Sequence, residues 1–97
     1  MDMKALMKQA EELQAKVAAA QAQLAETIVK GIAGNGLVVV EMDGKYNLRK
    51  LTISPELMKE SPEDAAAIIS AAINDAKAKA DKTIDDVMGE ATAGMPV

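Results

Sequence analysis

The pairs Asn35-Gly36 and Asp43-Gly44 are the features that most constrain the fold of this chain. Asn-Gly and Asp-Gly tolerate the positive φ values that a type I′ turn requires at its two central residues, and such turns join adjacent antiparallel strands. Both pairs lie between runs of β-branched or alternating residues, which is the pattern of short strands. We therefore predict a three-stranded antiparallel β-meander with strands at about 27–33, 37–42 and 46–53.

The glycines around the central strand also suggest a phosphate-binding loop, but their order disfavours this alternative. From Gly31 to Gly36 the spacing is G-x-x-G-x-G, whereas a dinucleotide-binding turn has G-x-G-x-x-G between a strand and a helix. The residues after Gly36 are Leu-Val-Val-Val, which favour a strand, so no helix N-terminus follows to receive an anion. The glycines are therefore expected to form turns.

A helix is predicted on each side of the meander. Near the N-terminus, apolar side chains recur every three or four positions and form a heptad-like stripe that another helix must cover. In the second half, Ser61 is a suitable N-cap, Pro62 a suitable first helical residue and Gly89 a suitable end. The prediction is one α+β domain over residues 1–97 with the order α-β-β-β-α: helix 2–25, the three strands, helix 62–88 and a flexible tail at 89–97.

The composition argues against an enzyme. The chain has no Cys and no His, which removes the thiolate nucleophile, the usual general base and the commonest metal ligands. The acidic residues have structural explanations, since Glu63 and Asp64 complement a helix N-terminus and Asp86 pairs with Lys82. Asp75 is an indifferent helix former and is expected to make a tertiary hydrogen bond, for example to the sheet. We predict no catalytic residue, no cofactor, no metal and no small-molecule substrate.

Charge is unevenly distributed along the chain. The net charge is −4, yet residues 1–50 contain seven basic and six acidic residues, whereas residues 51–97 contain four basic and nine acidic residues. The N-terminal half is therefore the better candidate for contact with an anionic partner. The first residues are charged and periodic, unlike a signal peptide or a membrane span, so we expect a cytoplasmic protein without membrane contact.

Basic residues of the N-terminal half suggest where an anionic partner binds. Lys4 and Lys8 lie one helical turn apart near a helix end, and further bases cluster on the second turn and third strand. The single aromatic residue, Tyr46, cannot supply a row of stacking platforms, which argues against single-strand or RRM-type recognition. The candidate DNA-binding residues are Lys4, Lys8, Lys16, Lys45, Arg49 and Lys50.

Three segments together resemble the YbaB/EbfC family of bacterial nucleoid-associated proteins. They are LMKQAEELQAKV from Leu6, GNGLVVVEMDGKYNLRKLTISPELM from Gly34 and AAINDAKAKAD from Ala71, and they occur in the right order over nearly the whole chain. The resemblance implies a cytoplasmic, nucleoid-associated homodimer shaped like tweezers, with central sheets and projecting helical arms. It also implies binding of double-stranded DNA and a role in nucleoid organisation or gene expression, without catalytic residues.

A second class of protein shares part of this pattern. Two helices with heptads around a β-region also resemble a prefoldin-type chaperone subunit, or holdase, which uses helix tips to hold unfolded chains. Helices of this length are short for coiled-coil tentacles, and three strands followed by Pro55 fit the first family better. Salt separates the two functions, because electrostatic DNA binding weakens steeply with salt whereas apolar holdase contacts do not.

Overall fold

The computed structural model describes residues 2–93 and confirms the predicted α-β-β-β-α order. One antiparallel sheet contains the strands in the order β1-β2-β3, and a short 3₁₀ helix, η1, precedes the second long helix. The elements are α1 (Met3–Glu26), β1 (Ile28–Ala33), β2 (Val38–Asp43), β3 (Leu48–Ile53), η1 (Pro55–Lys59) and α2 (Pro62–Thr92).

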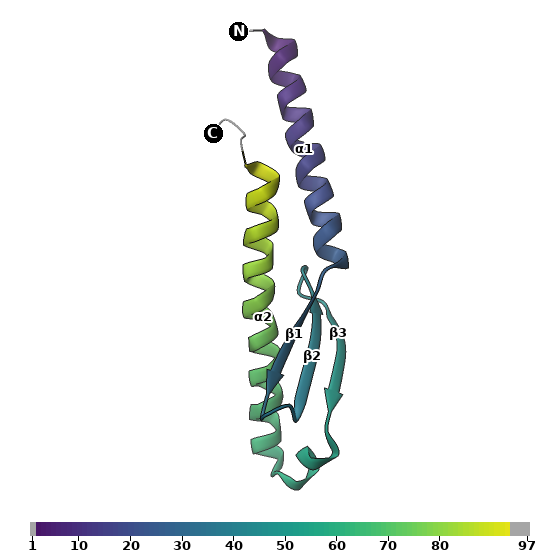
Figure 1. Ribbon diagram of the computed structural model, residues 1–97, viewed down its shortest axis with the longest axis vertical. Helices are drawn as coiled ribbons and strands as arrows, with labels where there is room; N and C mark the ends of the chain where they lie inside the picture. The colour runs from purple at the N-terminus through teal and green to yellow at the C-terminus, as the bar shows by residue number, and fades with distance from the viewer. Residues whose placement is uncertain (1, 94–97) are drawn as a thin grey trace.

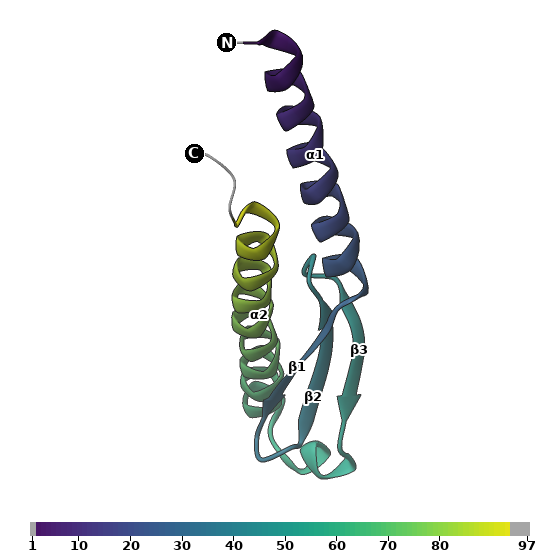
Figure 2. The same cartoon turned by 45° about the horizontal axis from the view of Figure 1, so that its top comes forward.

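The molecule is strongly elongated. Its principal extents are 68 × 19 × 16 Å, and its radius of gyration is 19.1 Å, against roughly 13 Å for a compact chain of this length. The first half of α2 covers the sheet, and its second half runs antiparallel beside the C-terminal half of α1 (Figure 1). The N-terminal half of α1 extends past the last turn of α2, as the turned view in Figure 2 also shows. We call the exposed N-terminal segment of α1, residues 3–16, the arm.

The hydrophobic core lies between the sheet and α2. Val38, Val40 and Met42 of β2 are buried, and they share a cluster with Leu57 and with three alanines of α2. These alanines, at positions 72, 76 and 80, recur every four residues and so lie on one helical stripe. Gly31 of β1 permits the close approach, because a Cβ there would lie 2.1 Å from the Ala72 carbonyl oxygen. Small residues therefore bring the helix backbone close to the sheet.

Side chains of α2 satisfy the outer edge of β1. The backbone N–H of Ile32 donates to Asp75 Oδ2 at 3.0 Å, and Lys79 Nζ donates to the Lys30 carbonyl oxygen at 2.7 Å. The tertiary hydrogen bond predicted for Asp75 is thus confirmed, and it lowers the pKa of this carboxyl together with Lys79. β3 forms the other edge of the sheet, and its residues are exposed except for the partly buried Ile53.

The first predicted turn is confirmed and the second is not. Asn35 and Gly36 have φ values of 55° and 91°, as a type I′ turn requires. Gly44 does not have a positive φ; in the second connection the positive value, 67°, belongs to Tyr46. The reason is that Asp43 is the last residue of β2, and its carboxylate organises a four-residue loop at residues 44–47. β3 accordingly begins at Leu48, two residues later than predicted.

The second helix is longer than predicted. It continues through Gly89 to Thr92, so the predicted end at residue 88 is wrong, and only residues 94–97 of the predicted tail lie outside the described residues. A mid-helix glycine costs about 1 kcal/mol relative to alanine. Contact of α2 with α1 offsets this cost, and Val87 and Ala91 line one groove between the two helices together with Ala20. Tertiary contacts therefore override the local signal.

Candidate nucleic-acid interface

The arm presents two lysines on one exposed helical face. Asp2 caps α1, its side chain accepting a hydrogen bond from the Lys4 backbone N–H at 3.0 Å. The Lys4 and Lys8 side chains lie one turn apart and are exposed, as are all arm residues. The first turn of α1 itself contains no acidic residue, so Lys4 lies near the positive end of the helix dipole with the Asp2 cap as the adjacent negative charge. Helix stability alone does not explain a lysine at this position.

Lys16 lies at the base of the arm, in a different environment. It is twelve residues beyond Lys4, which corresponds to about 18 Å along a helix axis. There it lines a groove between the two helices together with Gln23 of α1 and with Val87 and Glu90 of α2. Lys16 is therefore placed beside an acidic residue of the second helix.

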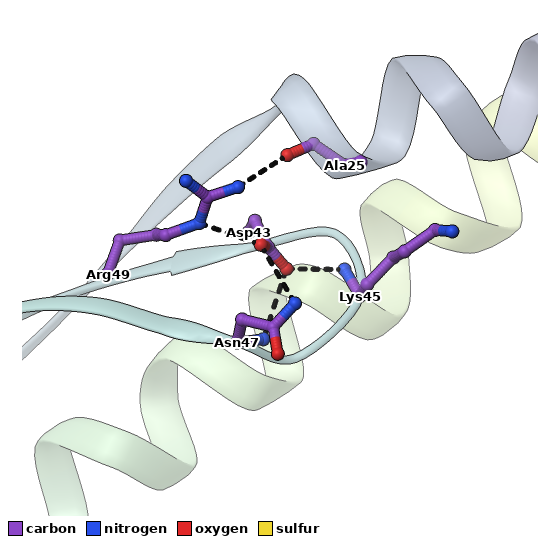
Figure 3. A network of polar contacts seen from close by, with 5 residues as sticks. All are labelled: Ala25, Asp43, Lys45, Asn47 and Arg49. Atoms are coloured by element: carbon purple, nitrogen blue, oxygen red, sulfur yellow. Dashed lines mark hydrogen bonds and ion pairs between the residues drawn. The ribbon is translucent and has the colours of Figure 1, made fainter.

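The β2–β3 loop is organised around a buried carboxylate, Asp43, which is fully inaccessible to solvent. Its Oδ1 accepts hydrogen bonds from the backbone N–H groups of Lys45 at 2.8 Å and Asn47 at 3.0 Å. Its Oδ2 accepts from Asn47 Nδ2 at 3.1 Å and from Arg49 Nε at 2.8 Å (Figure 3). Burial by itself raises the pKa of Asp43, but the hydrogen bonds from Arg49, Asn47 and Lys45 outweigh burial and hold this pKa well below its usual range. Asp43 is therefore a charged structural centre.

Arg49 belongs to this structural centre. Besides the ion pair with Asp43, its Nη2 donates to the Ala25 carbonyl oxygen in the last turn of α1, at 3.1 Å. The guanidinium thus joins the sheet to the end of the first helix (Figure 3). Sequence reasoning treated Asp43 as a turn residue and Arg49 as a DNA-binding residue, because no local pattern reveals an ion pair six positions apart in a hairpin.

The remaining predicted bases lie far from the arm tip. Lys45 is in the loop, and its side chain points away from the Asp43 carboxylate (Figure 3). Lys50 is exposed on β3 and pairs in register with Glu41 of β2. About twenty residues of helix, or roughly 30 Å, separate Lys4 from this end of α1. The structure therefore divides the predicted bases into an arm pair and a separate group near the sheet.

Charge also differs between the two helices. α2 carries seven acidic and three basic residues, and five of its last twelve residues are charged, four of them acidic. This acidic surface lies beside the C-terminal half of α1 (Figure 1). The tip of the arm extends beyond it, where an anionic partner meets lysines with less repulsion from α2.

Residues 2–93 also lack the features of two other classes of site. This part of the chain contains no group of three or more acidic residues placed to hold a metal ion. None of its helices combines the length and the apolar character needed to cross a membrane.

These features define an elongated α+β protein in which a lysine-bearing helix end projects from a small sheet. A family model described as the YbaB/EbfC DNA-binding family matches residues 1–95, and the chain belongs to this family. It is 44% identical over 94 residues to a nucleoid-associated protein of Neisseria meningitidis, a match covering 94% of this chain and 85% of the relative. It is 42% identical over 99 residues to a nucleoid-associated protein of Psychrobacter arcticus, covering 98% and 91%.

A solved structure has the same fold. The crystal structure of an uncharacterized protein from Helicobacter pylori superimposes with a TM-score of 0.82 and covers 93% of this chain and 96% of its own, at 20% sequence identity. The helix, meander and helix arrangement is therefore shared by a protein with a very different sequence.

Proposed function

We propose that this protein is a nucleoid-associated, non-catalytic protein that binds double-stranded DNA as a homodimer, through phosphate contacts from its arms. Membership of a DNA-binding family supports the choice of DNA as partner. The observation that carries the proposal is the arm itself, which is fully exposed and presents Lys4 and Lys8 on one face beyond the acidic second helix. Cytoplasmic, nucleoid localisation follows from the same function.

Phosphate contact suits these side chains better than base reading. A lysine ammonium is a flexible point charge and lacks the planar fork with which arginine recognises guanine. Binding through such contacts is tolerant of sequence and depends strongly on salt. Lys45 and Lys50 are further, weaker candidates for phosphate contact because both are exposed on the sheet end of the molecule.

The homodimer is supported by apolar surface that one chain leaves uncovered. Leu48 and Leu51 on β3 are 48% and 41% exposed, and Ile28 and Ile32 on β1 are 44% and 50% exposed. Because side chains of α2 occupy the edge of β1, the β3 edge is the more accessible of the two for a second chain. A two-fold dimer presents each arm twice, so that paired lysines straddle the phosphate backbone.

The prefoldin-type alternative has one observation in its favour, since apolar residues of the arm are exposed. Met3 and Met7 are 69% and 60% exposed, and such a surface can hold an unfolded chain. The match of the family model over residues 1–95 favours DNA binding instead.

A salt titration tests the proposed function against this alternative. We expect a duplex of about 30 base pairs to shift in a mobility assay at low salt, with affinity falling steeply as sodium chloride is raised, for unrelated sequences alike. Absence of a shift, or binding that does not respond to salt, would contradict the proposal. Suppression of aggregation of an unfolded client that persists at high salt would support the holdase.

A further inference from the structure

We propose that Arg49 and Asp43 are positioning residues, which fix the direction in which α1 leaves the sheet, so that Arg49 affects DNA binding through the arm and makes no phosphate contact. The inference rests on the proposed function for its DNA readout. Its structural part, the fixed direction of the arm, can be measured without DNA.

The covalent connection between α1 and the sheet does not determine this direction. α1 ends at Glu26 and β1 begins at Ile28, so Thr27 alone joins them. Thr27 bonds back to α1, since its N–H donates to the Leu24 carbonyl oxygen at 3.2 Å and its hydroxyl donates to the Gln23 carbonyl oxygen at 2.7 Å. These bonds cap the helix but do not tie it to the sheet. Tertiary contacts at the last turn of α1 must therefore fix its direction.

α2 packs along the C-terminal half of α1, and the β2–β3 loop and the start of β3 contact its last turn. The last carbonyl groups of a helix lack intrahelical partners, and α1 has no basic residue in its last turn to satisfy them. The Leu24 carbonyl oxygen accepts from the Gly44 N–H at 2.8 Å, and the Ala25 carbonyl oxygen accepts from Arg49 Nη2 at 3.1 Å. Two consecutive carbonyls of α1 are thus held from outside the helix.

The fit at this junction is tight. Leu24 is only 4% exposed, and a Cβ on Gly44 would lie 2.7 Å from the Leu24 carbonyl oxygen and 2.9 Å from its Cβ. Since close-packed groups cannot move independently, a shift of the loop moves the end of α1. When a rigid helix rotates about one end, each residue moves in proportion to its distance from that end. A small rotation at the last turn of α1 therefore produces the largest displacement at the tip of the arm.

The same loop also contacts the second helix. The Tyr46 hydroxyl donates a hydrogen bond to the Asp81 carboxylate of α2. Tyr46 has φ 67°, a left-handed conformation that a bulky residue adopts only when its surroundings hold it there. The loop therefore connects to both helices, and Asp43 maintains its shape from inside through four hydrogen bonds.

Arginine is required at position 49 by this geometry. Its rigid fork directs Nε to Asp43 and Nη2 to Ala25 at the same time, whereas a lysine offers one flexible ammonium and cannot reproduce both bonds. This difference separates a positioning role from a phosphate contact. A phosphate contact needs only the positive charge, which lysine retains.

The structural test measures the arm in the absence of DNA. The natural chain has no cysteine, so spin labels can be attached at Gln9→Cys on the arm and Ser70→Cys on α2, both exposed positions. Doubly labelled chains are diluted in excess unlabelled protein, and the intrachain distance distribution is measured by double electron–electron resonance. We expect a narrow distribution for the parent and for Lys50→Gln, and a broadened one for Arg49→Gln, Arg49→Lys and Asp43→Asn.

The DNA test uses the same variants without labels, with circular dichroism to confirm folding. We expect Arg49→Lys and Asp43→Asn to lose affinity roughly 3- to 30-fold, the range typical of coupling through a contact network. If Arg49 instead contacted phosphate directly, Arg49→Lys would keep its DNA affinity because lysine retains the positive charge. Asp43→Asn would bind DNA as tightly or more tightly, because it removes a negative charge. If Arg49→Gln fails to fold, Arg49→Lys decides the question.

The outcomes are distinct. Parent-like distance distributions in folded Arg49→Lys and Asp43→Asn would overturn the inference, as would parent-like DNA affinity in Arg49→Lys combined with a loss in Arg49→Gln. Broadened distributions in a protein that binds no DNA would support the positioning of the arm and refute only the proposed function.

Discussion

At the scale of single residues, Asp43 is the buried carboxylate that organises the β2–β3 loop. A fully buried carboxylate is unfavourable unless it is paired and hydrogen-bonded, and here each oxygen accepts two hydrogen bonds. Removing the charge leaves Arg49 without its partner and the loop without its centre. The stability that Asp43 provides is therefore tied to its ionised form.

This dependence predicts a pH effect. Because the pKa of Asp43 is held below its usual range in the folded protein, its contribution to stability is complete above the unfolded value of about 3.9 and is lost as pH falls toward the lower folded value. The gap in unfolding free energy between the natural protein and Asp43→Asn should shrink below about pH 4. Urea unfolding at several pH values measures it, with the exposed Asp86→Asn as control. If the difference in unfolding free energy did not change with pH, the ionised form of Asp43 would not be the stabilising one.

Replacing Gly36 and Gly44 by alanine should lower the stability of the protein by different amounts. Gly36 has positive φ with open space around it, so Gly36→Ala should cost about 1 kcal/mol and Gly36→Asn less, since asparagine tolerates this conformation. Gly44 lies against Leu24, so Gly44→Ala should cost more, on the order of 1–3 kcal/mol, through overpacking. Thermal unfolding monitored by circular dichroism compares them. If both alanine variants lost the same unfolding free energy, the close contact between Gly44 and Leu24 would not restrict the residue at position 44.

At the scale of elements, the sequence predicted existence and order well because each signal is local. Strand-like runs around Asn35-Gly36 and the cap at Ser61 depend on neighbours in the chain, and the structure confirms them. The end of α2 lies beside α1, which is distant in the sequence, and the shape of the second loop depends on the bond from Arg49 to Asp43. For the same reason the role of Arg49 could not be predicted from its charge.

The continuation of α2 past Gly89 gives a prediction at this scale. A Cβ on Gly89 meets open space, and the residue is helical. Gly89→Ala should therefore stabilise the protein by about 0.5–1 kcal/mol, by favouring the helix and reducing the freedom of the unfolded chain. Chemical denaturation gives the value. A destabilised variant would show that the last turn of α2 is not helical in solution.

At the scale of the whole molecule, a 68 Å long chain with a narrow body has too little core to cover its own apolar surface. Exposed leucines and isoleucines lie on the sheet, at Ile28, Ile32, Leu48 and Leu51, and also on the arm, at Leu6 and Leu13. The lysine pair lies in the first two turns of the arm. The β3 surface proposed for assembly and the lysine pair proposed for DNA contact therefore lie at opposite ends of α1, so each can be altered without the other.

The proposed homodimer leads to a test at β3. Leu51→Glu places a charge on an exposed apolar position beside the free edge, so it should weaken the dimer by at least tenfold, about 1.4 kcal/mol. Thr52→Glu, at the neighbouring exposed position opposite Val39, serves as the matched control. Sedimentation equilibrium at micromolar concentration distinguishes monomer from dimer. A Leu51→Glu protein that remains as dimeric as the natural one would place the interface elsewhere.

DNA binding by the arm can be measured through the salt dependence of DNA affinity in two matched double variants. Lys4→Gln with Lys8→Gln removes the arm pair, and Lys77→Gln with Lys82→Gln removes two exposed lysines of α2; Lys79 is avoided because it bonds the β1 edge. Fluorescence anisotropy of a labelled duplex gives log affinity against log salt. We predict that the arm variant loses about 0.9 of slope for each phosphate contact removed, while the α2 variant keeps the natural slope. An unchanged slope in the arm variant, or a larger loss in the α2 variant, would contradict DNA binding by the arm.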